Sequence, residues 1–143
     1  MKKAFSLLEL IIVIVVISII SSFVISKVND SINSSVKTKV KSEIALIRNQ
    51  IAKTKTKNIL LKNDSLIVLD KASVNIEKSK LFSNILDFPL ISTTKEKKEP
   101  GKWIKVSDKK YMIFTKDEEN LEFSFIDDSF ICKSAISLCN NYE

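Results

Sequence analysis

The stretch KKAFSLLELIIVIVVISII, residues 2–20, combines an apolar run with a single carboxylate, Glu9. The run continues to Ile25, so that 21 residues from Phe5 onward contain one charged side chain. As a helix this segment would be about 31 Å long, which matches the hydrocarbon thickness of a bilayer. The length therefore predicts a membrane-spanning helix. A carboxylate inside such a helix is costly, so Glu9 needs a compensating partner.

Two lysines, Lys2 and Lys3, precede the span. Positive charge that flanks a span stays on the cytoplasmic side, so we expect the N-terminus inside and everything after Lys27 outside. A secretory signal peptide cleaved near Ser26 is one alternative, and a plain membrane anchor is another. Glu9 argues against the signal peptide, because the apolar cores of signal peptides avoid carboxylates. The run is also longer than the roughly 7–15 residues of such cores.

The segment Ala4-Phe5-Ser6-Leu7-Leu8-Glu9 resembles the prepilin motif of type IV pilins and type II secretion pseudopilins. In that family a membrane-embedded prepilin peptidase cuts on the cytoplasmic side, just before the Phe, and methylates the new amino group. The resemblance implies cleavage between Ala4 and Phe5, with N-methylated Phe5 as the first residue. It also implies that Glu9 pairs with the Phe5 ammonium of an adjacent subunit during assembly. The family usually has Gly before the cut, where this chain has Ala4.

The charge of Glu9 can also be compensated without a second subunit. Cleavage would create both an ammonium at Phe5 and a helix start, and Glu9 lies one turn further on, about 6 Å along the axis. The pairing can therefore be internal, with support from the positive end of the helix dipole. A further alternative is that Glu9 only reaches back to the cytoplasmic interface.

The residues after the apolar run form a striped pattern, and no Pro or Gly interrupts the chain between Phe5 and Asn58. Apolar residues recur every three or four positions, which is typical of an amphipathic helix that packs on a globular domain. They are Val28, Ile32, Val36, Val40, Ile44, Ile47 and Ile51. We expect one continuous helix of about 50 residues, whose second half lies on a small head domain.

The net charge of +6 is concentrated in the stem, residues 27–57. The stem carries eight basic and two acidic side chains, whereas residues 58–143 carry thirteen basic and fourteen acidic ones. Six of the basic residues could form a phosphate-binding strip for DNA. They are Lys37, Lys39, Lys41, Lys53, Lys55 and Lys57. Without interleaved aromatic residues, the pattern favours a solvated helix face near anionic lipid head groups over nucleic-acid binding.

The last forty residues predict a small antiparallel sheet. Its strands are Trp103–Val106, Lys110–Thr115, Leu121–Ile126 and Phe130–Cys132. Short polar links between neighbouring strands make them antiparallel. In the third strand, Leu121, Phe123 and Phe125 alternate with Glu122 and Ser124, which predicts one apolar and one polar face.

Two further elements are expected between the stem and this sheet. Leu66–Leu69 predicts a short strand, and Ser79–Phe88 predicts a short helix that ends at Pro89. The fold class is therefore α+β, with a long N-terminal transmembrane and amphipathic helix packed on a small antiparallel β-meander. The pilin resemblance implies the same architecture.

Cys132 and Cys139 are the only cysteines of the chain. In an exported domain we expect them to form a disulfide that ties residues 134–140 to the sheet. Two free buried thiols are the main alternative, and a metal pair is the lesser one because the chain has no His. The acidic clusters 117–119 and 127–128 could hold Ca²⁺ but are more typical of hairpin tips. We expect neither a metal nor a cofactor.

Together with the resemblance, which implies the leader, these patterns divide the chain into four segments: a leader at residues 1–4, a transmembrane assembly helix at 5–26, the stem at 27–57 and a periplasmic head at 58–143. The resemblance implies a structural subunit of a type II secretion pseudopilus or of a type IV or DNA-uptake pilus. The Pro- and Trp-Gly-containing loop of major pseudopilins is absent, which favours a minor or divergent subunit.

The partners that the resemblance implies are other pilin or pseudopilin subunits, a prepilin peptidase, an assembly platform and the inner membrane. No catalytic constellation is present in the sequence, so we expect no enzymatic activity. The alternative function is an inner-membrane-anchored periplasmic binding module whose head recognises DNA or a secreted substrate.

Overall fold

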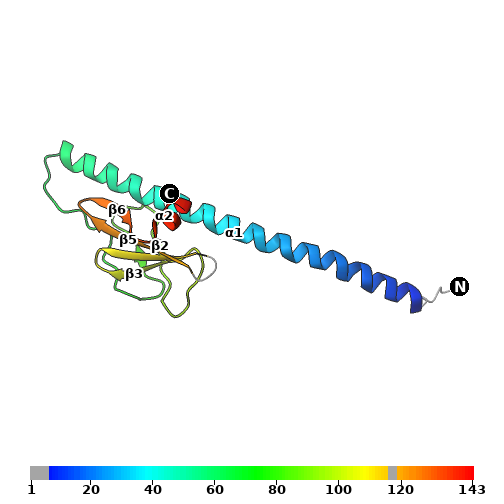
Figure 1. Ribbon diagram of the computed structural model, residues 1–143. Helices are drawn as coiled ribbons and strands as arrows, with labels where there is room; N and C mark the ends of the chain where they lie inside the picture. Colours follow the sequence, from blue (N-terminus) through cyan, green and yellow to red (C-terminus); the bar gives the residue numbers. More distant parts are fainter. Residues whose placement is uncertain (1–6, 116–118) are drawn as a thin grey trace. The chain divides into compact units, whose positions relative to one another are not determined.

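The computed structural model describes residues 7–115 and 119–143 (Figure 1). Its elements are, in order, α1 (Leu7–Leu60), β1 (Lys80–Leu81), β2 (Leu90–Ile91), β3 (Trp103–Ser107), β4 (Lys110–Phe114), β5 (Asn120–Ile126), β6 (Ser129–Cys132) and α2 (Ile136–Tyr142). This is the α+β class that the sequence predicts. The chain divides into two compact units, Met1–Ser35 and Val36–Glu143. The second unit includes helical residues that the sequence analysis assigned to the stem.

Helix α1 extends over 54 residues. Its length follows from the absence of Pro and Gly, which confirms the expected continuous helix over the described residues. The helix ends in a Schellman motif, because Lys62 adopts a left-handed φ of 49° and the amide of Asn63 donates to the carbonyl of Asn58 at 2.9 Å. Lys57 lies in the last turn, where a positive charge interacts favourably with the helix dipole.

The apolar stripe of α1 forms one side of the core of the second unit. Four of its members are buried, namely Val40, Ile44, Ile47 and Ile51. Val36 is half-buried and packs against the same core. Val28 and Ile32, which the sequence analysis placed on the same stripe, belong to the first unit and are 49% and 55% exposed. Within the second unit, the expected packing of the stripe is confirmed from Val36 onward.

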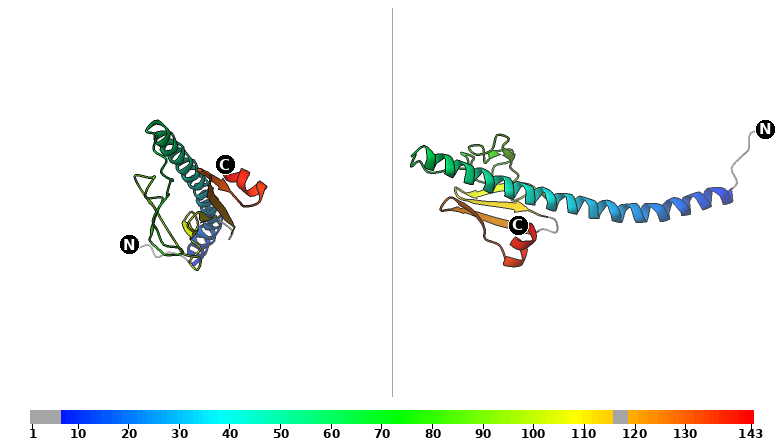
Figure 2. Two further views of the ribbon diagram at one scale, coloured as in Figure 1. Left: turned by 90° about the vertical axis from the view of Figure 1, so that its left-hand side faces the viewer. Right: turned by 90° about the horizontal axis from the view of Figure 1, so that it is seen from above.

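Strands β3, β4, β5 and β6 form the expected antiparallel meander in that order. The sheet lies against the part of α1 that belongs to the second unit (Figure 2). Aromatic rings fill the space between them: Phe123 and Phe130 stack with centroids 4.9 Å apart, and Trp103 lies 5.5 Å from Phe123. Trp103 is 1% exposed, so the single tryptophan of the chain is part of the core.

The opposite face of the sheet is less polar than the sequence predicts. Ile104, Met112 and Phe114 form a second, smaller buried cluster there. Glu122 is exposed as expected, but Ser124 is buried. The expected polar face was inferred from the alternation of β5, whereas β3 and β4 place apolar side chains on both faces of the sheet.

The strand expected at Leu66–Leu69 is absent from the described part of the chain. This segment has no strand alongside it, and the carbonyls of Val68 and Leu69 accept hydrogen bonds from the side chain and the amide of Asn84 instead. Leu66 is 89% exposed. The local apolar run was compatible with a strand, but a strand also needs a partner, which the tertiary structure does not place there.

The helix expected at Ser79–Phe88 is also wrong. Lys80 and Leu81 form β1, which pairs with β2, and Phe82 then adopts a left-handed φ of 57°. The amides of Ile85 and Leu86 both donate to the carbonyl of Phe82, which closes a single turn. The reason for the break lies outside the segment, because the amide of Phe82 donates to the carboxylate of Asp70 at 2.9 Å.

A buried ion pair connects the loop after α1 to the sheet. The Lys105 ammonium lies 2.9 Å from Asp70 Oδ1, and the two side chains are 5% and 0% exposed. Asp70 also accepts hydrogen bonds from the Tyr111 hydroxyl at 2.8 Å and from the amides of Ala72 and Phe82. Burial, and after it the negative charge of Asp70, holds the pKa of Tyr111 well above its usual range. Both oxygens of the Asp70 carboxylate thus accept two hydrogen bonds each, and all four bonds stabilise the fold.

The acidic pair Asp127 and Asp128 forms the turn between β5 and β6. Both residues have positive φ, 49° and 55°, as a two-residue type I′ hairpin turn requires. Asp128 also lies 3.9 Å from Lys55 of α1. The structure therefore accounts for this acidic cluster as a hairpin tip, while residues 117 and 118 of the other cluster lie outside the described residues.

Candidate functional site: the N-terminal apolar helix

The first unit contains a segment of α1, Leu7–Ile25, that is long and apolar enough to cross a membrane. Its side chains are exposed throughout. Leucine, isoleucine and valine occupy every side of the helix, so the segment has no polar face that would suit it to water. A helix that is apolar all round requires an apolar environment, which a bilayer or a bundle of similar helices provides.

Glu9 lies in the first described turn of α1 and is the acidic residue of that turn. It is also the one Asp, Glu, Lys or Arg of residues 7–25. At this end of the helix the backbone N–H groups give a positive partial charge, which stabilises a carboxylate. Ala4 and Phe5, the expected cleavage site and methylated residue, lie outside the described residues.

The hydroxyl of Ser18, inside the apolar segment, donates to the carbonyl of Ile14 at 2.7 Å. Such a bond to the preceding turn satisfies the hydroxyl without a partner outside the helix. Ser18 is therefore compatible with an apolar surrounding, and no Pro or Gly weakens the helix around it.

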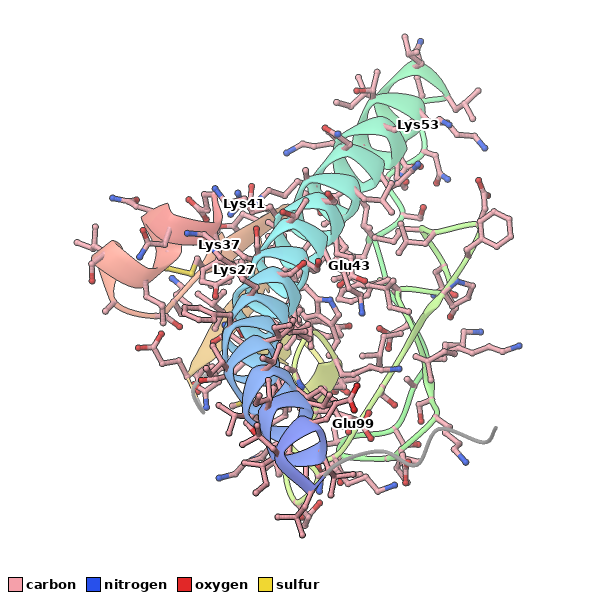
Figure 3. All side chains as sticks on the ribbon, turned by 90° about the vertical axis from the view of Figure 1, so that its right-hand side faces the viewer. Lys27, Lys37, Lys41, Glu43, Lys53 and Glu99 are labelled. Atoms are coloured by element: carbon pink, nitrogen blue, oxygen red, sulfur yellow. A yellow bond between two sulfur atoms is a disulfide. The ribbon has the colours of Figure 1, made fainter. Side chains whose placement is uncertain are left out.

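The lysines of α1 in the second unit do not form a single strip. Lys37 lies 5.7 Å from the ring centroid of Tyr142 in α2, and Lys39 donates to the carbonyl of Gly101 at 2.7 Å. Lys55 faces Asp128. Figure 3 shows Lys37 and Lys41 on the side of α2, and Lys53 at a different position around and along the helix. This distribution, with several lysines engaged by the head itself, favours the interpretation of a solvated helix face over a phosphate-binding strip.

Glu43 forms a polar contact between α1 and the sheet. The indole N–H of Trp103 donates to Glu43 Oε2 at 2.8 Å, and Lys39 lies 3.8 Å from Glu43 Oε1. Burial raises the pKa of Glu43 above its usual value, although the hydrogen bond from Trp103 and the nearby lysines oppose the shift. No local sequence pattern indicated this contact, which joins residues 60 positions apart.

The free energy of unfolding should therefore depend on the titration of Glu43. The folded state binds the proton of Glu43 more tightly than the unfolded chain, so the group contributes stability at acidic pH. This contribution is lost as the pH rises through the raised pKa of the folded state. Glu43→Gln should remove this dependence, so that wild type becomes less stable relative to the variant between about pH 4 and pH 7. Denaturation followed by Trp103 fluorescence, at several pH values, measures the free energy of unfolding of both proteins. A constant difference across this range would contradict the prediction, and Glu99→Gln, at an exposed residue, is the control.

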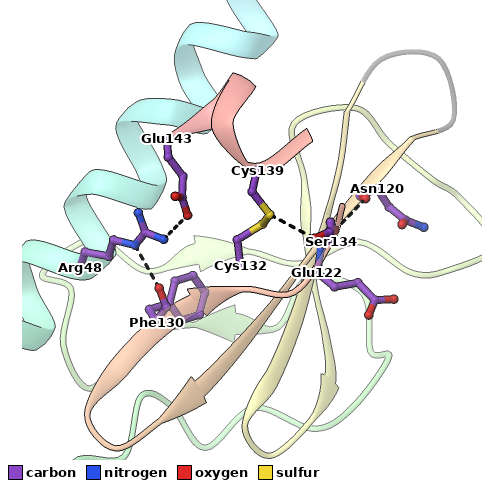
Figure 4. Close-up of a disulfide and its surroundings, with 8 residues drawn as sticks. All are labelled: Arg48, Asn120, Glu122, Phe130, Cys132, Ser134, Cys139 and Glu143. Atoms are coloured by element: carbon purple, nitrogen blue, oxygen red, sulfur yellow. Dashed lines mark hydrogen bonds and ion pairs between the residues drawn. A yellow bond between two sulfur atoms is a disulfide. The ribbon is translucent and has the colours of Figure 1, made fainter. Parts of the chain in front are cut away.

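The predicted cysteine pair is joined in the structure. Cys132 of β6 and Cys139 of α2 form a disulfide, with Cα atoms 6.0 Å apart (Figure 4). The sequence did not predict α2, since its N-cap residue, Ala135, has no side chain that could cap a helix. The helix has only seven residues. Its position depends on the disulfide, on the contact of Tyr142 with Lys37 of α1, and on the ion pair between Arg48 of α1 and Glu143, the residue that follows the helix.

Removing the disulfide should destabilise the second unit and release α2. The double variant Cys132→Ser with Cys139→Ser is expected to lose about 2–3 kcal/mol of unfolding free energy, because closing a loop of this length restricts the unfolded chain. Limited proteolysis should then cut first near residues 134–143. Equal stability and equal protease resistance of the variant and the oxidised wild type would be evidence against a structural role.

One segment of the chain matches a known protein-family model. Residues 1–25 match the family model described as the prokaryotic N-terminal methylation motif. The chain carries the prepilin signal of type IV pilins and pseudopilins. The matched segment includes Glu9 and the apolar residues to Ile25. Comparisons with curated proteins and with solved structures gave no match.

The prepilin motif explains two features of the first unit. Its apolar helix and its carboxylate in the first turn are the features of a pilin-like precursor that is anchored in a membrane and assembles with other pilins. Processing by a prepilin peptidase is implied as well. Among the described residues, no group of three or more His, Cys, Asp or Glu side chains is arranged to hold a metal ion.

Proposed function

We propose that this chain is a structural, prepilin-like subunit of a pilus or a periplasmic pseudopilus. It is held in the bacterial inner membrane with its N-terminus in the cytoplasm and its head, residues 58–143, in the periplasm. A prepilin peptidase cuts between Ala4 and Phe5 and methylates the Phe5 amine. The mature subunit then joins other pilin or pseudopilin subunits through its N-terminal helix on an assembly platform.

The observation that supports this proposal most strongly is Glu9 within the prepilin motif. A carboxylate in the first turn of an apolar helix is costly in a membrane unless it meets a positive charge. In an assembled filament, the Phe5 ammonium of a neighbouring subunit supplies that charge and fixes the position of one helix against the next. The rest of the helix surface, apolar on every side, suits a bundle of identical or similar helices.

The second unit supports a structural role for the head. Its carboxylates hold the fold: the buried Asp70 accepts hydrogen bonds from four donors, and the partly buried Glu43 accepts one from Trp103. The head thus serves as a stable module carried by the helix. Because the loop of major pseudopilins is missing from the sequence, we assign the chain to the minor subunits.

Co-expression with the remaining subunits of its assembly system tests this proposal. The chain should be recovered in sheared filaments or in cross-linked complexes with other pilin-like subunits, and recovery should require an active prepilin peptidase. If the other subunits assemble while this chain stays entirely in the membrane as a monomer, the proposed function is wrong, and an anchored binding module becomes the better assignment.

A further inference from the structure

A groove within the second unit follows the outer edge of the sheet, where β6 lies next to α1 and α2 (Figure 4). Its volume is about 580 Å³, within the range of about 300–1,000 Å³ that is usual for ligand-binding clefts. Its walls include Arg48, Ile51 and Lys55 of α1, Phe130 and Ile131 of β6, and Ile136 of α2.

Strand β6 directs backbone groups toward this groove. It is the last strand of the sheet order, and among the described residues no strand pairs with its outer side. Phe125 of β5 faces Phe130 but donates its amide to Lys109 on the other side. In an antiparallel pair of this kind the N–H and C=O of Phe130 point away from β5, and those of Cys132, two residues on, do the same. An exposed edge of this kind is a template for another strand.

Arg48 already holds one backbone group and one carboxylate in the groove. Its Nε donates to the carbonyl of Phe130 at 3.0 Å, and its guanidinium forms an ion pair with the side chain of Glu143. The two charged side chains are 36% and 35% exposed. An ion pair that solvent reaches to this extent contributes little net stability, so another carboxylate can replace Glu143 at low cost.

We propose that the groove binds an extended acidic segment of a partner protein, which adds as a strand to β6 and places a carboxylate on Arg48 in the position of Glu143. Backbone hydrogen bonds with the N–H of Phe130 and with the N–H and C=O of Cys132 would provide affinity, as in other cases of strand addition. Ile131 and Ile136 are 40% and 80% exposed and provide apolar contacts for alternate side chains of the segment. Glu143 then acts as an internal competitor for the site.

The inferred site involves only residues of the second unit. It does not depend on cleavage before Phe5 or on filament assembly. A failure of the binding experiment would therefore leave the proposed function intact, and a failure of assembly would leave the groove intact.

The experiment uses the full chain in detergent micelles and a labelled peptide, acetyl-Val-Thr-Val-Glu-Val-Thr-Val-amide. Fluorescence anisotropy should show saturable binding. Arg48→Gln should weaken the affinity about tenfold, as expected for loss of a charged hydrogen bond. Glu143→Gln should strengthen the affinity several-fold, because it removes the competitor. Lys53→Gln, which changes a lysine of α1 outside the groove, should bind as wild type does.

Two further measurements separate strand addition from charge attraction. A peptide with N-methylated backbone amides keeps the glutamate and should lose binding, and a peptide with lysine in place of glutamate should lose it too. Intact Trp103 fluorescence and an intact disulfide in each variant show that the fold is retained. The proposal is overturned if neither wild type nor Glu143→Gln binds the peptide, or if binding is indifferent to Arg48→Gln or to N-methylation. Self-association of Glu143→Gln without peptide would assign the groove to a second copy and also overturn it.

Discussion

Asp70→Ala should remove a large part of the free energy of unfolding of the head. The substitution leaves the Lys105 ammonium buried without its counter-charge and removes the acceptor of the Tyr111 hydroxyl. Breaking a buried pair in this way typically costs about 3–5 kcal/mol, which is a large part of the roughly 5–15 kcal/mol that stabilises a domain. Denaturation followed by Trp103 fluorescence measures the loss, and Asp87→Ala, at an exposed position, should be nearly neutral.

A compensating variant tests whether the unpaired charge is the cause. Asp70→Asn combined with Lys105→Met removes the charge of both partners while keeping similar shapes, and it should recover much of the stability lost in Asp70→Ala. Replacement of a whole buried pair by uncharged groups is often close to neutral. If Asp70→Ala is as stable as wild type, the cluster does not hold the loop after α1 to the sheet.

Glu9→Leu should abolish assembly while membrane insertion and cleavage continue. The substitution makes the helix more apolar, so insertion should be at least as efficient; a central charge costs about 2.5–3.5 kcal/mol on insertion scales, and less near an end. Cleavage before Phe5 should continue, because the cut bond lies a full turn from the changed side chain. Incorporation next to a partner should fail, since the Phe5 ammonium of that partner would remain without its counter-charge.

The comparison with wild type separates these steps. Expression beside the partner subunits allows cleavage, head folding and recovery in sheared filaments to be measured for the same sample. Ser6→Ala, a change next to the cut that keeps Glu9, serves as the control for altered processing. If Glu9→Leu is incorporated as efficiently as wild type, Glu9 only reaches the cytoplasmic membrane interface and does not fix the position of one helix against the next.

The features that the sequence predicts are those set by local pattern. The absence of Pro and Gly from Phe5 to Asn58 predicts α1, and the alternation of Leu121, Phe123 and Phe125 predicts a buried face of β5. The polar links between the last four strands predict the antiparallel order. Each of these signals depends on residues close together in the chain, where propensity and burial agree.

The features that the sequence misses depend on distant partners. Tyr111 reaches Asp70 across 41 positions, and no local pattern shows that an Asp after an apolar run will be buried beside a lysine. The same carboxylate holds Phe82 in a left-handed conformation, which replaces the expected helix by β1 and a turn. Helix α2 was missed because no capping residue marks its start and the disulfide supplies the constraint instead.

The N-terminus of the protein extracted from membranes tests the central claim most directly. Mass spectrometry of the N-terminal peptide, from cells with an active prepilin peptidase, should show N-methylated Phe5 as the first residue. In cells without the peptidase, the same peptide should begin at Met1. Retention of Met1 in the presence of the peptidase would contradict the account. A chain that begins near Ser26, as expected after cleavage of a signal peptide, would contradict it too.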